Sequence, residues 1–116
     1  MKNDGALRLP ALANTASDKN RFTLTATIAQ REALRYTPAG IAALECTLSH
    51  QSLQREAGRE RSVECELHAI AFDDIARSLS AVAVGGMIHC EGFVARRYRS
   101  GNAVALHITR FTNEEH

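Results

Sequence analysis

Both tyrosines of this chain stand directly beside arginines, in two polar segments that lie far apart in the sequence. Arg35 precedes Tyr36, and a second run reads Arg96, Arg97, Tyr98 and Arg99. A guanidinium binds phosphate through paired hydrogen bonds, and an aromatic ring gives a nucleobase a face on which to stack. The pairing therefore indicates binding of single-stranded nucleic acid. Exposed loops also carry arginine for solubility and tyrosines also close the ends of small barrels, so this alternative stays open.

The basic residues are almost all of one type. Twelve of the fourteen are arginine, whereas the formal net charge of the 116-residue chain is only +1. Arginine suits phosphate recognition better than lysine does. A GC-rich genome produces the same bias, so the positions of the arginines carry the argument and their number does not.

Other chemistry finds little support in the sequence. The histidines (His50, His68, His89, His107 and His116) have neither the H-x3-H nor the H-E-x-x-H spacing of a metal site, so we expect no metal and no cofactor. The chain has no G-x-S-x-G nucleophile motif and no phosphate-binding Walker loop. Asp73 and Asp74 are explained by the start of a helix. The prediction is a protein that is not an enzyme.

The cysteines, Cys46, Cys65 and Cys90, are widely spaced and form no C-x-x-C pair. This spacing favours neither a disulfide framework nor a zinc ribbon. Each falls on an apolar position of a strand pattern, so we expect all three to be small buried core side chains.

Hydrophobic alternation predicts five strands and one helix. The strands cover residues 22–28, 42–48, 63–67, 87–95 and 104–108, and the helix covers 70–79. Residues 37–40 predict a turn, residues 51–61 a long connecting loop whose charged residues form a solvated hairpin tip, and Gly92 a bulge or sharp bend within its strand. Three strands, a short helix and two further strands are the element order of the OB-fold. We predict an all-β, five-stranded Greek-key barrel with its helix between the third and fourth strands.

One domain accounts for the length of the chain. Residues 1–19 show no sustained period and are interpreted as a flexible arm, and residues 20–113 as the barrel. No apolar stretch is long enough to span a membrane and no signal-peptide pattern is present, so we expect a soluble, cytoplasmic protein.

In an OB barrel, ligands bind to one face and to the loops after the first and fourth strands. These loops hold the two arginine–tyrosine segments. Gln51, at the end of the second strand, is a further candidate contact on this face. Alternation places Phe93 on the outer surface, where it is either a stacking platform or part of a subunit interface.

Several segments resemble the primosomal replication protein N (PriB) family. They are Asn20-Arg21, the stretch from Leu34 to Ile41 containing Thr37-Pro38-Ala39-Gly40, the stretch from Leu48 to Ser52, and the run from Gln54 to Gly58. The later Gly85-Gly86, Glu91-Gly92-Phe93 and Leu106-His107-Ile108 fit the same pattern. The resemblance extends from about Asn20 to Thr112.

This resemblance implies a homodimer of OB-folds, related to bacterial single-stranded DNA-binding protein (SSB), that binds single-stranded DNA. It also implies contact with the restart helicase PriA, with SSB and, in some lineages, with DnaT. Basic contacts of the family match Arg35, Arg96, Arg97 and Arg99. A tryptophan that some members carry on the third strand is matched here by Glu64, and a basic residue after the second-strand histidine is matched by Gln51.

Two alternatives remain at the level of sequence. One is a general SSB-like protein that coats single strands, although this chain ends shortly after its last strand without an acidic recruiting tail. The other is an OB module that binds proteins and has little affinity for DNA, which the near-neutral net charge favours.

Overall fold

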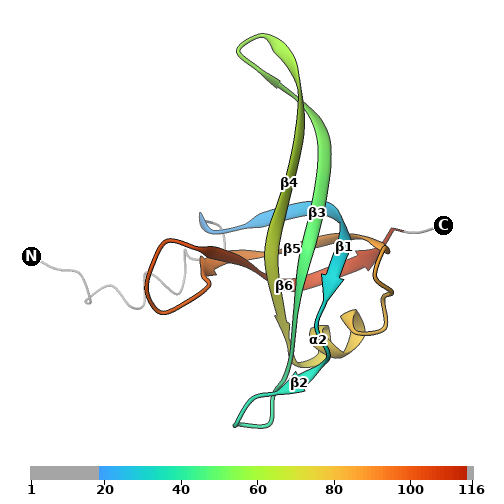
Figure 1. Ribbon diagram of the computed structural model, residues 1–116, viewed down its shortest axis with the longest axis vertical. Helices are drawn as coiled ribbons and strands as arrows, with labels where there is room; N and C mark the ends of the chain where they lie inside the picture. Colours follow the sequence, from blue (N-terminus) through green and yellow to red (C-terminus); the bar gives the residue numbers. More distant parts are fainter. Residues whose placement is uncertain (1–18, 115–116) are drawn as a thin grey trace, which may run out of the picture.

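The computed structural model describes residues 19–114, which fold into one highly curved sheet with a single helix (Figure 1). The elements are β1 (Phe22–Arg31), β2 (Arg35–Tyr36), β3 (Ala42–Glu56), β4 (Arg59–Phe72), α2 (Asp73–Leu79), β5 (Met87–Arg96) and β6 (Val104–Asn113). The strand order is β1-β5-β6-β4-β3-β2, and an additional pairing of β1 with β3 closes the sheet into a barrel. This confirms the predicted OB-fold. The proposed arm at residues 1–19 lies, apart from Lys19, outside the described residues.

The alternation that predicts the strands also determines the core. Side chains at every second position of five strands point into the barrel and are buried. The largest of them are Ile28, Leu44, Leu48, Ile88 and Leu106. Among the described residues, no buried side chain is polar or charged, so each polar side chain of this part of the chain is at least partly exposed.

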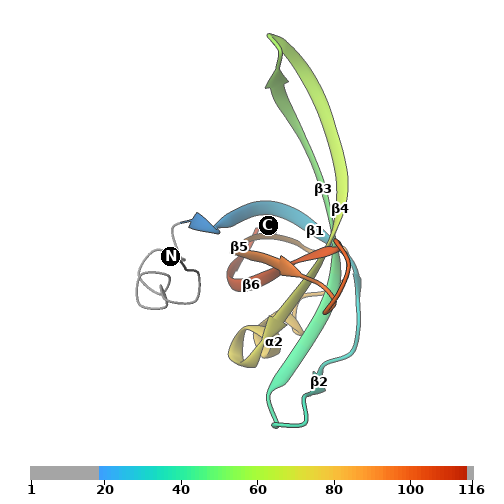
Figure 2. The ribbon, with the colours of Figure 1, turned by 90° about the vertical axis from the view of Figure 1, so that its left-hand side faces the viewer.

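Helix α2 lies at one end of the barrel, against β3 and β4 (Figures 1 and 2). It begins at Asp73 and not at residue 70 as predicted, because residues 70–72 still belong to β4, where Ala71 is buried in the core. Asp73 and Asp74 occupy the first turn, where both pair with Arg77 at 2.8 and 2.6 Å. The helix therefore follows the third long strand as expected, but the short β2 makes that strand β4.

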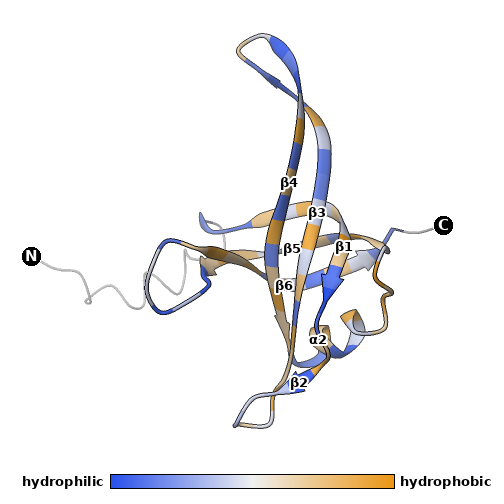
Figure 3. Cartoon of the chain, in the orientation of Figure 1, coloured by the Kyte–Doolittle hydropathy of each residue, from blue (hydrophilic) through white to orange (hydrophobic). Residues whose placement is uncertain are grey.

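Residues 51–61 form a hairpin arm. A hairpin tip is therefore confirmed here, but the prediction of a long connecting loop is wrong because the two strands stay paired. β3 and β4 stay paired from Ala43↔Phe72 to Glu56↔Arg59, and only Ala57 and Gly58, both with positive φ, make the turn. Two residues with positive φ are what a tight hairpin turn requires. The arm projects well beyond the barrel and is mostly hydrophilic toward its tip (Figures 2 and 3). Both of its faces meet solvent, so its side chains lack the alternation by which a strand is recognised.

Two of the three cysteines are buried. Cys46 and Cys90 lie in the core, and burial raises the pKa of each thiol to about 11. Cys65 is exposed, which corrects the prediction. It has the parity of the core positions of β4, but it pairs with His50 where the arm leaves the barrel, beyond the apolar side chains that would cover it.

A bulge interrupts the pairing of β5 with β6 between Glu91 and Gly92, as the glycine predicts. Turn 37–40 is also confirmed, with the Gly40 amide donating to the Thr37 carbonyl at 2.8 Å and φ of +84° at Gly40. None of the described residues forms a helix that is both long and apolar enough to cross a membrane.

Candidate nucleic-acid interface

A groove of about 380 Å³ on the outer face of the barrel brings the two arginine–tyrosine segments together. Arg35 comes from β2, whereas Arg96, Arg97 and Tyr98 come from the end of β5 and the loop that follows it. The floor consists of outward-facing residues of β3, β4 and β6, namely Glu45, His68, Ile70, Phe72, Ala105 and His107. Closure of the barrel is what makes these sequence-distant segments neighbours.

Arg35 is held at the groove by an acidic partner. Its Nη2 donates to Oε2 of Glu45 at 2.7 Å, and Oε1 of the same carboxylate lies 2.8 Å from Nε2 of His68. The hydrogen bond from Arg35, together with the one from His68, lowers the pKa of Glu45 although its partial burial opposes the shift. Glu45 is therefore ionised at neutral pH, and it is the acidic residue among the groove's lining.

The loop between β5 and β6 presents one ring and its cations in a fixed arrangement. The Arg97 guanidinium lies over the Tyr98 ring at 5.0 Å from its centroid, within cation–π range. Arg96 donates to the carbonyl of Arg99 at 2.7 Å, and the Arg97 amide donates to the carbonyl of Ala103 at 2.8 Å. The Tyr98 side chain remains 58% exposed, so part of its surface is available to a ligand.

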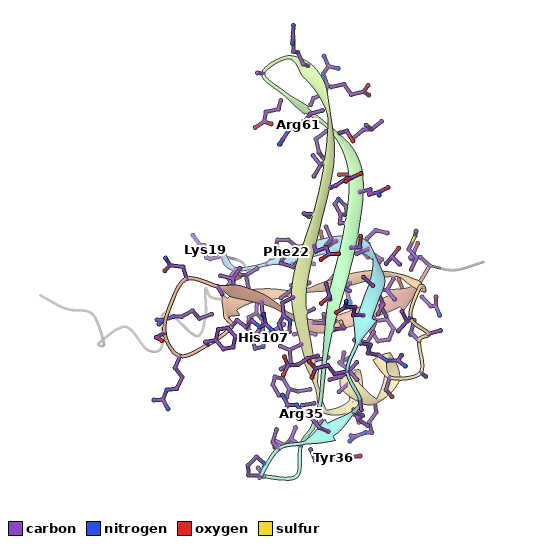
Figure 4. All side chains as sticks on the ribbon, in the orientation of Figure 1. Lys19, Phe22, Arg35, Tyr36, Arg61 and His107 are labelled. Carbon is purple, nitrogen blue, oxygen red and sulfur yellow. The ribbon has the colours of Figure 1, made fainter. Side chains whose placement is uncertain are left out.

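Three of the seven predicted nucleic-acid contacts lie outside this groove. Tyr36 is on β2 beside Arg35 (Figure 4) and is 59% exposed, but among the described residues neither it nor Arg99 lines the groove. Gln51 lines a separate hollow at the base of the arm, together with residues of β1 and with Met87. The structure thus brings together four of the six arginine–tyrosine candidates and leaves Gln51 apart.

Phe93 belongs to a row of three rings that crosses β5, β6 and β4. It stacks on His107 with centroids 4.8 Å apart and an angle of 13° between planes, and His107 lies 6.1 Å from Phe72. Phe93 and Phe72 are both about two-fifths exposed. Burial lowers the pKa of His107, which favours its neutral imidazole. This row adjoins Tyr98 through the groove floor, so the groove has an aromatic side.

Sequence reasoning missed Phe72 and His107 in this row. The helix predicted over residues 70–79 includes Phe72, and His107 enters the sequence analysis as a possible metal ligand and as part of the family resemblance, not as a surface ring. The alternation of side chains along each strand could have identified both residues. His107 lies between the buried Leu106 and Ile108, and Phe72 follows the buried Ala71, so both side chains point outward. Outward-facing rings at matching heights on three strands are visible only once the strand order is known.

The described residues contain no group of three or more His, Cys, Asp or Glu side chains arranged to hold a metal ion. His50, for example, lies 2.7 Å through Nδ1 from the Thr25 carbonyl and 2.9 Å through Nε2 from the Ser52 hydroxyl. Both ring nitrogens thus have protein partners.

Comparison with known proteins gives a consistent result. Residues 20–110 match a profile described as another single-strand binding protein family. Replication restart protein PriB of Nitrosomonas europaea is 36% identical over 91 residues, covering 78% of this chain and 84% of the relative, and PriB of Bordetella pertussis is 37% identical over 89 residues, covering 77% and 83%.

Solved structures agree with these sequence matches. A PriB structure from Ralstonia solanacearum has a TM-score of 0.76 at 35% identity, covering 83% of this chain and 98% of that one. The single-stranded DNA-binding protein of Thermus aquaticus has a TM-score of 0.68 at 25% identity, covering 83% and 50%. Fold, matched length and identity point the same way, and this chain belongs to the PriB family of SSB-like replication restart proteins.

Proposed function

We propose that this protein binds single-stranded DNA in the groove between β2 and the β5–β6 loop, and that it acts in replication restart by stimulating the PriA helicase. The observation that carries the proposal is the groove itself, in which Arg35, Arg96, Arg97 and Tyr98 converge beside the aromatic row. The membership of the chain in the PriB family supports it. Binding and assembly need no catalytic group, in keeping with a protein that is not an enzyme.

Recognition divides between charge and stacking. Arginines contact phosphates and release counterions, whereas each ring that stacks on a base contributes about 1–3 kcal/mol. Neither contact reads base sequence, because every base has a flat face and every nucleotide a phosphate. The proposed site therefore takes single strands of mixed sequence, and it excludes duplex DNA, whose bases are already stacked.

The arm sets a limit on the length of the bound strand. Glu60, Glu64 and Glu66 are exposed on β4 and share the parity of the groove residue His68. Carboxylates repel phosphates, so the strand follows the groove and does not continue along this side of the arm. The expected affinity is micromolar or weaker, and it falls steeply with added salt.

A second copy of the chain has a natural docking edge on β1. Residues 22–26 pair with β5 on one side, whereas β3 joins β1 only from Thr27 onward, so along 22–26 no strand within the described chain occupies the other side. Unpaired strand edges favour addition of another strand. We infer a homodimer, in which two grooves act on one strand.

Fluorescence anisotropy with labelled oligo-dT and with duplex DNA, each with and without PriA, tests this function. We expect binding of the oligo-dT at low salt, little binding of the duplex and stimulation of helicase unwinding. Stimulation without detectable strand binding would instead favour an OB module that contacts proteins such as PriA, SSB or DnaT, which the acidic side of the arm also suits. Strand coating without any effect on PriA would favour a general SSB-like role.

The role of Phe93 is tested by Phe93→Leu, which keeps apolar volume but removes the ring. If Phe93 stacks on a base, affinity for oligo-dT falls about 5- to 150-fold with little change in salt dependence, because no charge is lost. If it lies in a subunit interface, strand affinity at saturating protein stays nearly unchanged and sedimentation velocity shows a shift toward monomer.

A further inference from the structure

Glu45 is an unexpected residue in a groove that is proposed to bind phosphates. It lies on the outer face of β3, opposite Ile70 of β4, and lines the groove with Arg35, Arg97 and His68. Its two oxygens have separate partners, Arg35 at 2.7 Å and His68 at 2.8 Å. A carboxylate therefore occupies one of the hydrogen-bonding positions that a phosphate would take on Arg35.

The Glu45 carboxylate is also held in place. Its side chain is 23% exposed and that of His68 only 14%, and both project from paired strands within the sheet. The hydrogen bond from Arg35 keeps the pKa of Glu45 below its usual range, so the charge persists at neutral pH. A phosphate that reaches Arg35 must therefore approach a fixed negative charge.

We propose that Glu45 competes with the DNA strand for Arg35 and thereby lowers the affinity of the groove for single-stranded DNA. This inference rests on the proposed function, because it presupposes that the groove binds the strand. Arg35 then contacts a phosphate only when it leaves Glu45. Arg96 and Arg97 have no acidic partner among the groove residues, so they contact phosphates without such competition.

A purely structural role is the main alternative. β2 has only two residues, and the Arg35–Glu45 pair could simply fasten it to β3. Exposed pairs of this kind contribute little to stability. The two roles differ in their consequences, since a fastening pair affects the unfolding temperature and a competing pair affects strand affinity.

Glu45→Gln separates them, because the amide keeps the shape and one hydrogen-bond acceptor but removes the charge. Glu91→Gln is the matched control: its side chain is equally exposed at 23% and pairs with Arg110 at 3.0 Å, but it lines a different hollow on β5 and β6. Both variants change the net charge of the chain by the same amount, so a general charge effect appears in both.

Anisotropy with labelled oligo-dT at several salt concentrations is the measurement. We expect Glu45→Gln to bind roughly three- to tenfold more tightly than the unmodified protein, with a steeper salt dependence, and Glu91→Gln to bind as the unmodified protein does. Arg35→Ala should cost little by itself but should remove the gain when combined with Glu45→Gln.

Equal tightening by both glutamine variants, or none with Glu45→Gln while the unmodified protein still binds oligo-dT, would overturn the competition and leave the proposed function standing. Failure of both the unmodified protein and Glu45→Gln to bind at low salt would overturn the competition and the proposed function together. Thermal unfolding of each variant verifies that the barrel is intact.

Discussion

Arg97→Ala combined with Arg99→Ala is expected to weaken binding of oligo-dT roughly 10- to 100-fold at about 50 mM salt. Each arginine that neutralises a phosphate on a single strand contributes about 0.7 to the slope of log affinity against log salt. Loss of two contacts therefore makes the slope shallower by about 1.4. Arg97 lines the groove and packs over Tyr98, while Arg99 extends the same exposed loop, so the double variant removes two cations from one side of the proposed site.

Arg59→Ala combined with Arg61→Ala is the control for this result. It removes the same number of charges from the tip of the arm, far from the groove (Figure 4). We expect a much smaller loss of affinity and an unchanged salt slope, apart from the general effect of net charge. Equal losses from the two double variants would show that the loop between β5 and β6 is not the binding site.

Gly92→Ala is expected to destabilise the fold by more than about 3 kcal/mol, because side chains forced into packed backbone are among the costliest changes. A Cβ on Gly92 would lie 1.7 Å from the carbonyl oxygen of His107, 2.8 Å from its carbonyl carbon and 3.2 Å from Cα of Ile108. All three are backbone atoms of β6, so no rotamer change can relieve the overlap. To accept the Cβ, β5 and β6 must separate at the bulge. This separation also disturbs the part of the sheet that carries Phe93 and His107.

Chemical denaturation followed by circular dichroism measures this loss. Gly101→Ala is the comparison, because a Cβ there meets no atom within 4 Å although its φ is +91°. Alanine at such a φ costs about 1–2 kcal/mol through backbone strain alone. A variant at Gly92 no less stable than the one at Gly101 would contradict the close approach of the two strands.

Local signals were enough for most of the fold. The alternation of apolar side chains defines the strands because the barrel has one inner face, and the turn at 37–40 and the bend at Gly92 follow from residues with special backbone freedom. The same reasoning failed where a strand has no buried face. Residues 51–61 stay paired only because the backbone ladder continues, and the exposure of Cys65 depends on where covering strands end.

The site shows the same division. Arginine beside tyrosine, in loops that an OB barrel brings to one face, predicts a site at Arg35, Arg96, Arg97 and Tyr98, and the structure places these four around one groove. Outward parity predicts that Phe93 lies on the surface, where it stacks on His107; that these residues bind DNA stays a prediction. Local sequence cannot show that Gln51 faces another hollow, that Phe72 and His107 extend the row of rings, or that Glu45 holds Arg35.

The sequence by itself determined which residues have the chemistry to bind single-stranded DNA, because this depends on side-chain type. It also determined which segments form β-strands, because these follow from apolar residues that recur with a period of two. The tertiary structure decided which of those residues meet. That depends on the order β1-β5-β6-β4-β3-β2 and on its closure by β1 and β3, and strand order is set by packing between residues far apart in the chain. The arginine–tyrosine pairs are visible in the sequence, whereas the position of the Glu45 carboxylate beside Arg35 follows only from the folded barrel.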